Sequence, residues 1–168
     1  IMDFLNIILT SKCNWSCSYC DFSSIPFSDR KDADVKNIST LLPEMFDLIS
    51  PHALSIMGGE IGLIDNDSLG TTLMIYSNYC VKNNIQGRVA FFTNGTFFNS
   101  PHFQEHTKYK NIDYIYCIHV KDSNLRKQFI HPKNISERKV VPVVVVRKDN
   151  LQDVKEFLLL NMKQVVHI

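Results

Sequence analysis

The chain has 168 residues, of which 45% are hydrophobic and 21% charged, and its formal net charge is +1. These values predict one globular domain over 1–168 and give no basic field that would attract nucleic acid. The longest apolar run, over 140–146, is far shorter than the roughly 20 residues that cross a bilayer, and residues 1–9 lack a secretory signal pattern, so we expect a cytoplasmic protein without a membrane span.

Hydrophobic patterning predicts short strands that alternate with helices along the chain. Strands are expected at 3–9, 53–57, 88–92, 113–120, 139–146 and 165–168. Helices are expected from Thr40 as N-cap with Pro43 in the first turn, from Asp67 or Ser68, from Pro101 after Ser100, over 123–130, and after Asn150 as N-cap. Because parallel neighbouring strands need crossover connections, this alternation predicts an α/β fold with a parallel sheet.

Polar or glycine-rich segments follow the expected strands throughout the chain. They cover 13–20, 58–60, 93–95, 119–121 and 147–150. In parallel α/β folds the loops after the carboxyl ends of the strands meet at one edge of the sheet, and ligand sites are built there. The sequence therefore predicts one functional site formed by these segments.

Three of the five cysteines fall in one short stretch, CNWSCSYC, as Cys13, Cys17 and Cys20. An odd, clustered set is more typical of thiolates that bind a metal or a cluster in a reducing compartment than of a disulfide framework. Three thiolates are one fewer than the four ligands that close a zinc site or a cubane cluster, and the first His after them is His52. The residues leave open a zinc site that uses a remote His and an iron–sulfur cluster with one open position. Cys80, on the apolar stripe of the second expected helix, is predicted to be a buried hydrophobe.

The cysteine spacing resembles the CxxxCxφC signature of the radical S-adenosylmethionine enzymes, in which φ is usually aromatic and is here Tyr19. In that family three thiolates bind a 4Fe-4S cluster, and the fourth iron is chelated by the amino and carboxylate groups of S-adenosylmethionine. The reduced cluster cleaves the sulfonium, and the resulting 5'-deoxyadenosyl radical takes a hydrogen atom from the substrate. The resemblance implies that Cys13, Cys17 and Cys20 are the cluster ligands and that Tyr19 packs near the adenine. It also implies a partial (β/α)6 TIM-type barrel of parallel strands, open on one side.

A second segment, MGGE, resembles the GGE motif of this family at the end of the second strand. Gly58 and Gly59 would let backbone carbonyls approach the methionyl ammonium of the cofactor, and Glu60 would support that contact electrostatically. The family form usually continues with proline, whereas Ile61 follows here, which leaves the loop geometry open. A glycine pair after a strand is also an ordinary turn.

The tripeptide Thr-Asn-Gly at 93–95 resembles a segment that many members of the family carry at the end of the third strand. The resemblance implies that Thr93 and Asn94 offer a hydroxyl and an amide group to the cofactor. An ordinary Asn-Gly turn is the alternative interpretation.

In the fourth expected strand, a period of two places Cys117, His119 and Lys121 on one face. The family has polar residues here that contact the ribose or the methionyl carboxylate, which implies cofactor binding by His119 and Lys121, and a solvated strand end is the alternative. Arg147, after the fifth strand, is a further candidate to pair with a carboxylate of the cofactor. The pattern leaves the roles of Cys117 and His167 open.

These motifs together predict a radical S-adenosylmethionine enzyme whose reductant is of the flavodoxin or ferredoxin type. No cysteine motif follows the last expected strand, and we expect the open side of the barrel to receive a peptide or protein substrate. A glycyl-radical-enzyme activase is an alternative within the family, although few residues precede Cys13. From another class, the alternative is a non-catalytic iron–sulfur or zinc-binding module for electron transfer, a task that requires neither GGE nor TNG.

Overall fold

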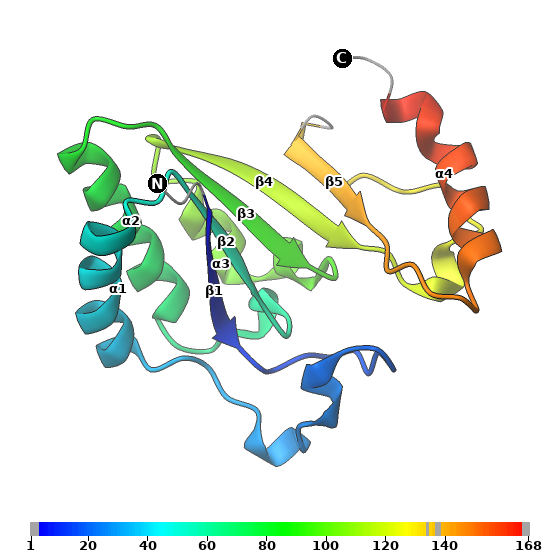
Figure 1. The fold of residues 1–168 in the computed structure, drawn as a ribbon, viewed down its shortest axis with the longest axis horizontal. Helices are drawn as coiled ribbons and strands as arrows, with labels where there is room; N and C mark the ends of the chain where they lie inside the picture. Colours follow the sequence, from blue (N-terminus) through cyan, green and yellow to red (C-terminus); the bar gives the residue numbers. More distant parts are fainter. Residues whose placement is uncertain (1–3, 134, 137–138, 166–168) are drawn as a thin grey trace.

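The computed structural model describes residues 4–133, 135–136 and 139–165, and Figure 1 shows one layer of strands with helices beside it. The five-stranded sheet has the order β1-β2-β3-β4-β5, and every neighbouring pair is parallel. Because β1 and β5 are its edges, the described sheet is open, and the predicted α/β class with a parallel sheet is confirmed. The strands are β1 (Phe4–Thr10), β2 (Ala53–Gly58), β3 (Gly87–Thr93), β4 (Ile112–His119) and β5 (Val140–Val143).

Helices α1, α2 and α3 share one hydrophobic core with the sheet, whereas α4 lies apart from them, nearer to β5 (Figure 1). Short 3-10 turns lie in the long loop after β1 and in the loops after β2, β3 and β4. The helices are α1 (Val35–Ile49), α2 (Ser68–Lys82), α3 (Pro101–His106) and α4 (Leu151–Val165). The 3-10 turns are η1 (Asp21–Ser24), η2 (Phe27–Asp29), η3 (Ile61–Leu63), η4 (Thr96–Asn99) and η5 (Asp122–Asn124).

Helix α1 begins earlier in the chain than predicted. Its N-cap is Asp34, whose carboxylate accepts a hydrogen bond from Asn37 N at 2.9 Å, so the prediction of Thr40 as the cap was wrong. Pro43 therefore lies inside the helix, where it leaves the carbonyl of Ser39 without its helical partner. Both residues are exposed, so water can bond to that carbonyl and the helix continues through the proline.

The two faces of the sheet have different surroundings. On β4, Tyr116 and Ile118 are buried against the helices, whereas Cys117 and His119 point to the opposite face and are half-buried. Helix α2 buries its predicted apolar stripe, and Cys80 within it is fully buried, as the sequence predicts. The face away from α1–α3 therefore carries the side chains that reach the candidate site.

The segment after β4 differs from the helix predicted over 123–130. The structure has the single turn η5 there, followed by irregular chain. Phe129 N donates a hydrogen bond at 2.9 Å to Asn161 Oδ1 of α4, so this backbone bonds to a neighbouring helix instead of to itself. Pro132 also disfavours the helical conformation of the residue before it.

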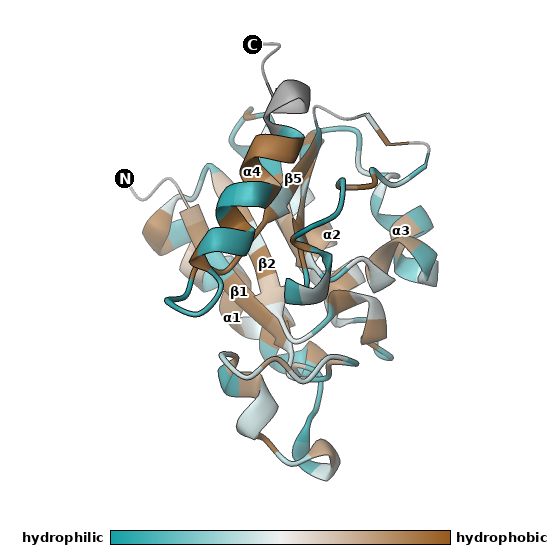
Figure 2. Ribbon diagram, turned by 90° about the vertical axis from the view of Figure 1, so that its right-hand side faces the viewer, coloured by the Kyte–Doolittle hydropathy of each residue, from teal (hydrophilic) through white to brown (hydrophobic). Residues whose placement is uncertain are grey.

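Helix α4 packs on a second, smaller core beyond the sheet edge. Its Val154 and Phe157 contact Val120 and Leu125, which follow β4. The two other apolar residues that the pattern places on the same face, Leu151 and Leu158, are exposed. Figure 2 shows the resulting bands of hydrophobic and hydrophilic residues around α4.

The end of the chain bears on two further expectations. β5 ends at Val143, short of the predicted 139–146, and Val165 of the predicted last strand is the final residue of α4. The rest of that strand, including His167, lies outside the described residues. Among the helices of the described residues, none combines the length and the apolar character needed to cross a membrane.

One buried histidine gives the core a pH dependence. His106 is 1% exposed and lies among aromatic rings, with Nε2 bonded to the Tyr116 hydroxyl at 2.7 Å and no described partner for Nδ1. Burial lowers the pKa of His106 to about 4. Because an unfolded histidine titrates near 6.5, the unfolded state binds more protons between these values, and stability falls as the pH drops from about 6.5 to about 4.

We expect that acid-dependent loss to reach roughly 3 kcal/mol at pH 4, and His106→Gln to remove most of it, because the amide keeps a polar partner for Tyr116 without titrating. Urea unfolding at pH 7 and pH 4.5 measures the difference. His102→Gln, at a half-buried ring one turn earlier on α3, is the matched control and should retain the wild-type pH slope. An equal slope in wild type and His106→Gln would show that another group carries the effect.

Candidate functional site

A cavity of about 220 Å³ opens at the carboxyl ends of the strands. Of the residues predicted for the site, Glu60, Lys121 and Arg147 do not line this cavity, and all the others do. The loop after β1 and the ends of β2, β3, β4 and β5 contribute to it, so the segments that the sequence places after successive strands do meet. The lining residues are Cys13, Trp15, Cys17, Tyr19, Cys20, Met57, Gly58, Gly59, Phe92, Thr93, Asn94, Cys117, His119 and Val143.

The three clustered cysteines lie on the loop after β1 with free, partly exposed thiols. A tight turn joins Cys20 N to Cys17 O at 3.1 Å, and Trp15 N donates to the Cys13 sulfur at 3.4 Å. Burial raises the pKa of Cys13, a hydrogen bond from Trp15 opposes this, and the charges of Glu60, Cys17 and Cys20 raise it further. The thiolates thus repel one another, and a positively charged metal group between them would remove that repulsion.

Within the described ranges, no three His, Cys, Asp or Glu side chains are arranged to hold one metal ion. A tetrahedral zinc site needs donors that converge on one point. A cubane cluster instead takes each thiolate on a different iron, so its ligands surround it and do not meet at one ion. Cys13, Cys17 and Cys20 line one cavity, which is compatible with such an arrangement.

The start of the cysteine loop is held by an ionic network that the sequence did not reveal. The Lys12 ammonium lies 2.9 Å from Asp32 and 2.7 Å from Asp65, and the Thr10 hydroxyl donates to Asp32 at 2.7 Å. Burial raises the pKa of Asp32, but hydrogen bonds from Asp65, Lys12 and Thr10 outweigh it and keep the pKa below its usual value. Asp32 therefore stays ionised and ties the far end of the loop to β1.

The two glycines of the MGGE segment are required by the neighbouring backbone. Gly58 has φ +144°, and a Cβ added to it would lie 2.2 Å from Thr10 O. A Cβ on Gly59 would lie 2.1 Å from Lys12 O, because Gly59 N donates to Thr10 O at 2.7 Å. Glu60 N then donates to Lys12 O at 2.6 Å, so this segment continues the β1–β2 pairing into the cysteine loop. Close approach to that loop explains both glycines without a ligand.

Glu60 lies beneath the cavity instead of in its wall. Its side chain is fully buried, and Oε1 accepts hydrogen bonds from Gly62 N at 2.9 Å and from the Thr93 hydroxyl at 2.7 Å. Oε2 accepts from Asn94 N at 2.6 Å. The carboxylate therefore joins the loops after β2 and β3, whereas the family resemblance implies that it supports the contact with the cofactor ammonium electrostatically.

Asn94 connects the loop after β3 to the cysteine loop. Its amide donates to Asn14 Oδ1 at 2.7 Å, Asn14 donates to the Thr96 hydroxyl at 3.0 Å, and that hydroxyl donates to Asn94 Oδ1 at 2.8 Å. Gly95 between them has φ +102°, which favours glycine. This closed ring of three hydrogen bonds orients the segment between Cys13 and Cys17, a role that the sequence did not predict for Asn14.

On the β4 side, the wall of the cavity is formed by His119 together with two aromatic residues of the cysteine loop. The Tyr19 hydroxyl is hydrogen-bonded to His119 Nε2, and the Trp15 ring meets the His119 ring edge-on at 6.0 Å between centroids. Burial lowers the pKa of His119 and raises the pKa of Tyr19, so both are neutral near pH 7 and the hydroxyl donates to the imidazole. Trp15 is not among the residues predicted for the site from the sequence. Its position between the cysteines, as the only tryptophan of the chain, is the one feature of the sequence that could have indicated a role at the site.

Arg147 pairs with carboxylates of its own chain. Its guanidinium lies 2.7 Å from Asp122 and 3.1 Å from Asp149, and these hydrogen bonds raise the pKa of the arginine. The guanidinium carbon of Arg147 also lies 5.0 Å from the centroid of the ring of Tyr19, which lines the cavity. Asn150 directly precedes α4, as predicted for the helix cap, and its carbonyl accepts from Val154 N at 3.0 Å. Its side chain accepts from Arg147 N at 2.8 Å and donates to Asp122 at 3.2 Å. These contacts explain Arg147 as a residue that orders the loops after β4 and β5.

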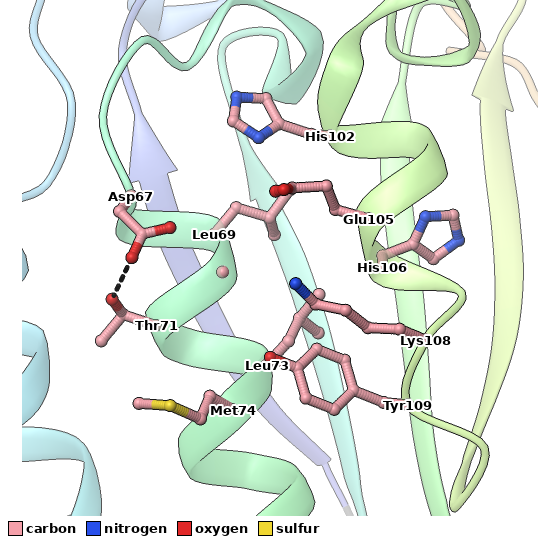
Figure 3. Close-up of a pocket in the computed structure, with 11 residues that line it drawn as sticks. Asp67, Leu69, Thr71, Leu73, Met74, His102, Glu105, His106, Lys108 and Tyr109 are labelled. Carbon is pink, nitrogen blue, oxygen red and sulfur yellow. Dashed lines mark hydrogen bonds between the residues drawn. The ribbon is translucent and has the colours of Figure 1, made fainter.

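A further cleft of about 210 Å³ lies between α2 and α3 (Figure 3). Asp67 and Thr71 on its α2 side bond to each other, and His102 bonds to Ile64 O at 2.8 Å. No residue predicted for the functional site lines this cleft. Asp67, Thr71 and His102 thus have partners within the fold, and no residue lines both this cleft and the cysteine cavity.

A comparison of the chain with known protein families, with characterised proteins and with solved structures found no match.

Proposed function

We propose that the protein is a radical S-adenosylmethionine enzyme in which Cys13, Cys17 and Cys20 bind a 4Fe-4S cluster and the adjoining cavity receives S-adenosylmethionine. The observation that carries the proposal is the convergence of three separate motifs on one cavity: the cysteines after β1, Gly58 and Gly59 after β2, and Thr93 and Asn94 after β3. Any one of these motifs has an ordinary structural explanation. Their meeting at the carboxyl edge of a parallel sheet favours a common ligand.

The sheet order supports the finer fold that the proposal requires. Doubly wound sheets reverse their strand order at the ligand site, whereas the strands of a (β/α) barrel follow one another in chain order. The described strands run β1 to β5 without reversal. We therefore propose a partial (β/α)6 TIM-type barrel, open on one side.

When bound, the cluster and S-adenosylmethionine supply a one-electron cleavage of the sulfonium and the transfer of a hydrogen atom from the substrate. The thiolates hold the cluster at the cavity mouth, and the Asn14–Asn94–Thr96 ring fixes the loop that carries them. Met57, Phe92 and Val143 give the cavity an apolar wall that excludes water. The Tyr19–His119 pair closes the cavity on the β4 side without a charge. The electron would come from a flavodoxin or ferredoxin type of reductant.

Anaerobic reconstitution with iron and sulfide, followed by dithionite and S-adenosylmethionine, tests the proposal. We expect a cluster absorbance with the electron paramagnetic resonance signal of a reduced 4Fe-4S centre, and equal amounts of 5'-deoxyadenosine and methionine. Omitting either iron or dithionite should abolish both products. A full cluster that yields no 5'-deoxyadenosine would indicate an electron-transfer module, and stoichiometric zinc without a cluster would indicate a structural site.

A further inference from the structure

A second cavity, of about 360 Å³, adjoins the cysteine cavity on its β4 side. Trp15, Asn94 and His119 line both cavities, so a molecule in the second lies directly beside a molecule in the first. We call the second cavity the lysine groove, after Lys121 and Lys127 on its walls. Lys121, predicted to bind the cofactor, thus lines this groove and not the cysteine cavity.

The groove carries an excess of positive charge. Lys121 and Lys127 line it, and no Asp or Glu is among the described lining residues. The Lys121 ammonium lies 5.5 Å from the Trp15 ring centroid, and the Lys127 ammonium donates to Asn124 Oδ1 at 3.2 Å. Neither forms an ion pair within the part of the chain that the structure describes.

Two acids on the segments that line the groove are paired with arginines and not with these lysines. Asp122, next to Lys121, is paired with Arg147 at 2.7 Å, and Asp153 of α4 is paired with Arg126 at 2.8 Å. The ammonium groups therefore present a positive potential to a ligand in the groove. A cationic substrate would find no carboxylate there.

Besides the lysines and several uncharged polar side chains, the groove has an apolar part. Val120 and Phe157 are buried beneath it, Phe129 is half-buried, and Ile130 on its rim is 86% exposed. A ligand that covers this isoleucine removes its apolar surface from water, which favours binding. The groove thus combines an apolar floor with two cations at one side.

We infer that the lysine groove binds the substrate, and that this substrate carries a carboxylate or phosphate on an apolar or aromatic group. The assignment as substrate rests on the proposed function of the adjoining cavity, because the shared wall places the ligand next to the site of cleavage. The anion would lie against Lys121 and Lys127, and the apolar part against Phe129 and Ile130. The same chemistry belongs to a free aromatic acid and to an apolar–acidic peptide segment.

Trp15 is a built-in reporter, because it is the only tryptophan and lines both cavities. The probes are 3-phenylpropionate, phenyl phosphate, the blocked dipeptide N-acetyl-Phe-Glu-amide and, as the cation of similar shape, 2-phenylethylamine. Tryptophan fluorescence and saturation-transfer NMR on the purified chain measure binding without a cluster. We expect the anions to bind, more weakly at high salt, and the amine not to bind. Tighter binding of the dipeptide assigns a peptide substrate, and tighter binding of the free acids assigns a small one.

The double variant Lys121→Gln with Lys127→Gln should weaken anion binding about tenfold, as expected for two exposed charge contacts. Lys108→Gln with Lys110→Gln removes the same charge near the α2–α3 cleft and should leave binding unchanged. Should the first pair fold poorly, Lys127→Gln alone and the salt dependence of the wild type give the same information. Equal binding of the amine, or unchanged binding in the groove variant, overturns the inference. Cleavage of S-adenosylmethionine without probe binding overturns the groove alone. Probe binding without cleavage overturns the proposed function, and with it the assignment of the ligand as a substrate, but leaves the groove as an anion-binding site.

Discussion

Cys17→Ala is expected to abolish both the cluster absorbance and the cleavage of S-adenosylmethionine. Cys17 is one of three thiols at the cavity mouth, and a cubane held by three thiolates has no spare protein ligand. Removing one leaves two irons without a protein thiolate, so the cluster should not assemble or should be lost to chelators. After reconstitution, the iron and sulfide content of the variant and its yield of 5'-deoxyadenosine should all fall to background.

Cys117→Ala is the matched control. Cys117 lines the same cavity from β4, and its side chain is half-buried. Like Cys17→Ala, this substitution replaces one cavity-lining cysteine by alanine. It should retain the cluster and the cleavage. Cys80 would be a poor control because it is fully buried, and its truncation would leave a hole in the core. Retention of the cluster in Cys17→Ala with its loss in Cys117→Ala would show that the ligand set is wrong.

Unfolding measurements separate this expectation from a simple loss of structure. Cys17 is partly exposed, and the loop that carries it is held by contacts elsewhere, from Lys12 to Asp32 and from Asn14 to Asn94 and Thr96. The free energy of unfolding of cluster-free Cys17→Ala should therefore lie within about 0.5 kcal/mol of that of the cluster-free wild type. A larger loss would mean that the thiol has a packing role.

Local patterning was enough to predict the places of the first five strands and the convergence of their loops. The period of two in β4 correctly separates Tyr116 and Ile118 from Cys117 and His119, because one face of that strand is buried by helices. Parallel pairing then brings the loop residues to one edge whatever their separation in the chain. For this reason the cysteines, Gly58 and Asn94 could be expected at one site from the sequence.

Long-range polar contacts could not be predicted in this way. From the sequence, Arg147 could bind a carboxylate of a ligand or pair with a carboxylate of its own chain. The fold brings it to Asp122, which lies 25 residues away in the sequence. The fold also supplies a distant partner for 123–130, whose backbone bonds to Asn161 of α4. In each case the partner lies outside the window over which a pattern is read.

Glu60 is the sharpest case, and it yields the second large expected effect. Both carboxylate oxygens accept hydrogen bonds from groups of two loops: Gly62 N, the Thr93 hydroxyl and Asn94 N. In Glu60→Gln the amide NH2 must replace one oxygen, and it would then face a backbone N–H as a second donor. We expect this variant to lose about 3 kcal/mol of stability, because a fully buried, charge-assisted hydrogen-bond centre becomes partly unsatisfied.

Urea unfolding of cluster-free protein measures this loss. Glu44→Gln, at an exposed position of α1, makes the same chemical change and should stay within about 0.5 kcal/mol of the wild type. Thr93→Val removes one of the donors to Glu60 and should fall between the two.

The comparison of stability with affinity decides what the carboxylate does. If Glu60 acts by joining the loops after β2 and β3, Glu60→Gln should weaken the folded state and S-adenosylmethionine binding together, since Asn94 and the cysteine loop are positioned through it. If Glu60 instead supports the contact with the cofactor ammonium electrostatically, as the family resemblance implies, affinity for S-adenosylmethionine should fall while stability stays at the wild-type value. The buried position of the side chain beneath the cavity, and its three hydrogen bonds to the chain itself, favour the first result.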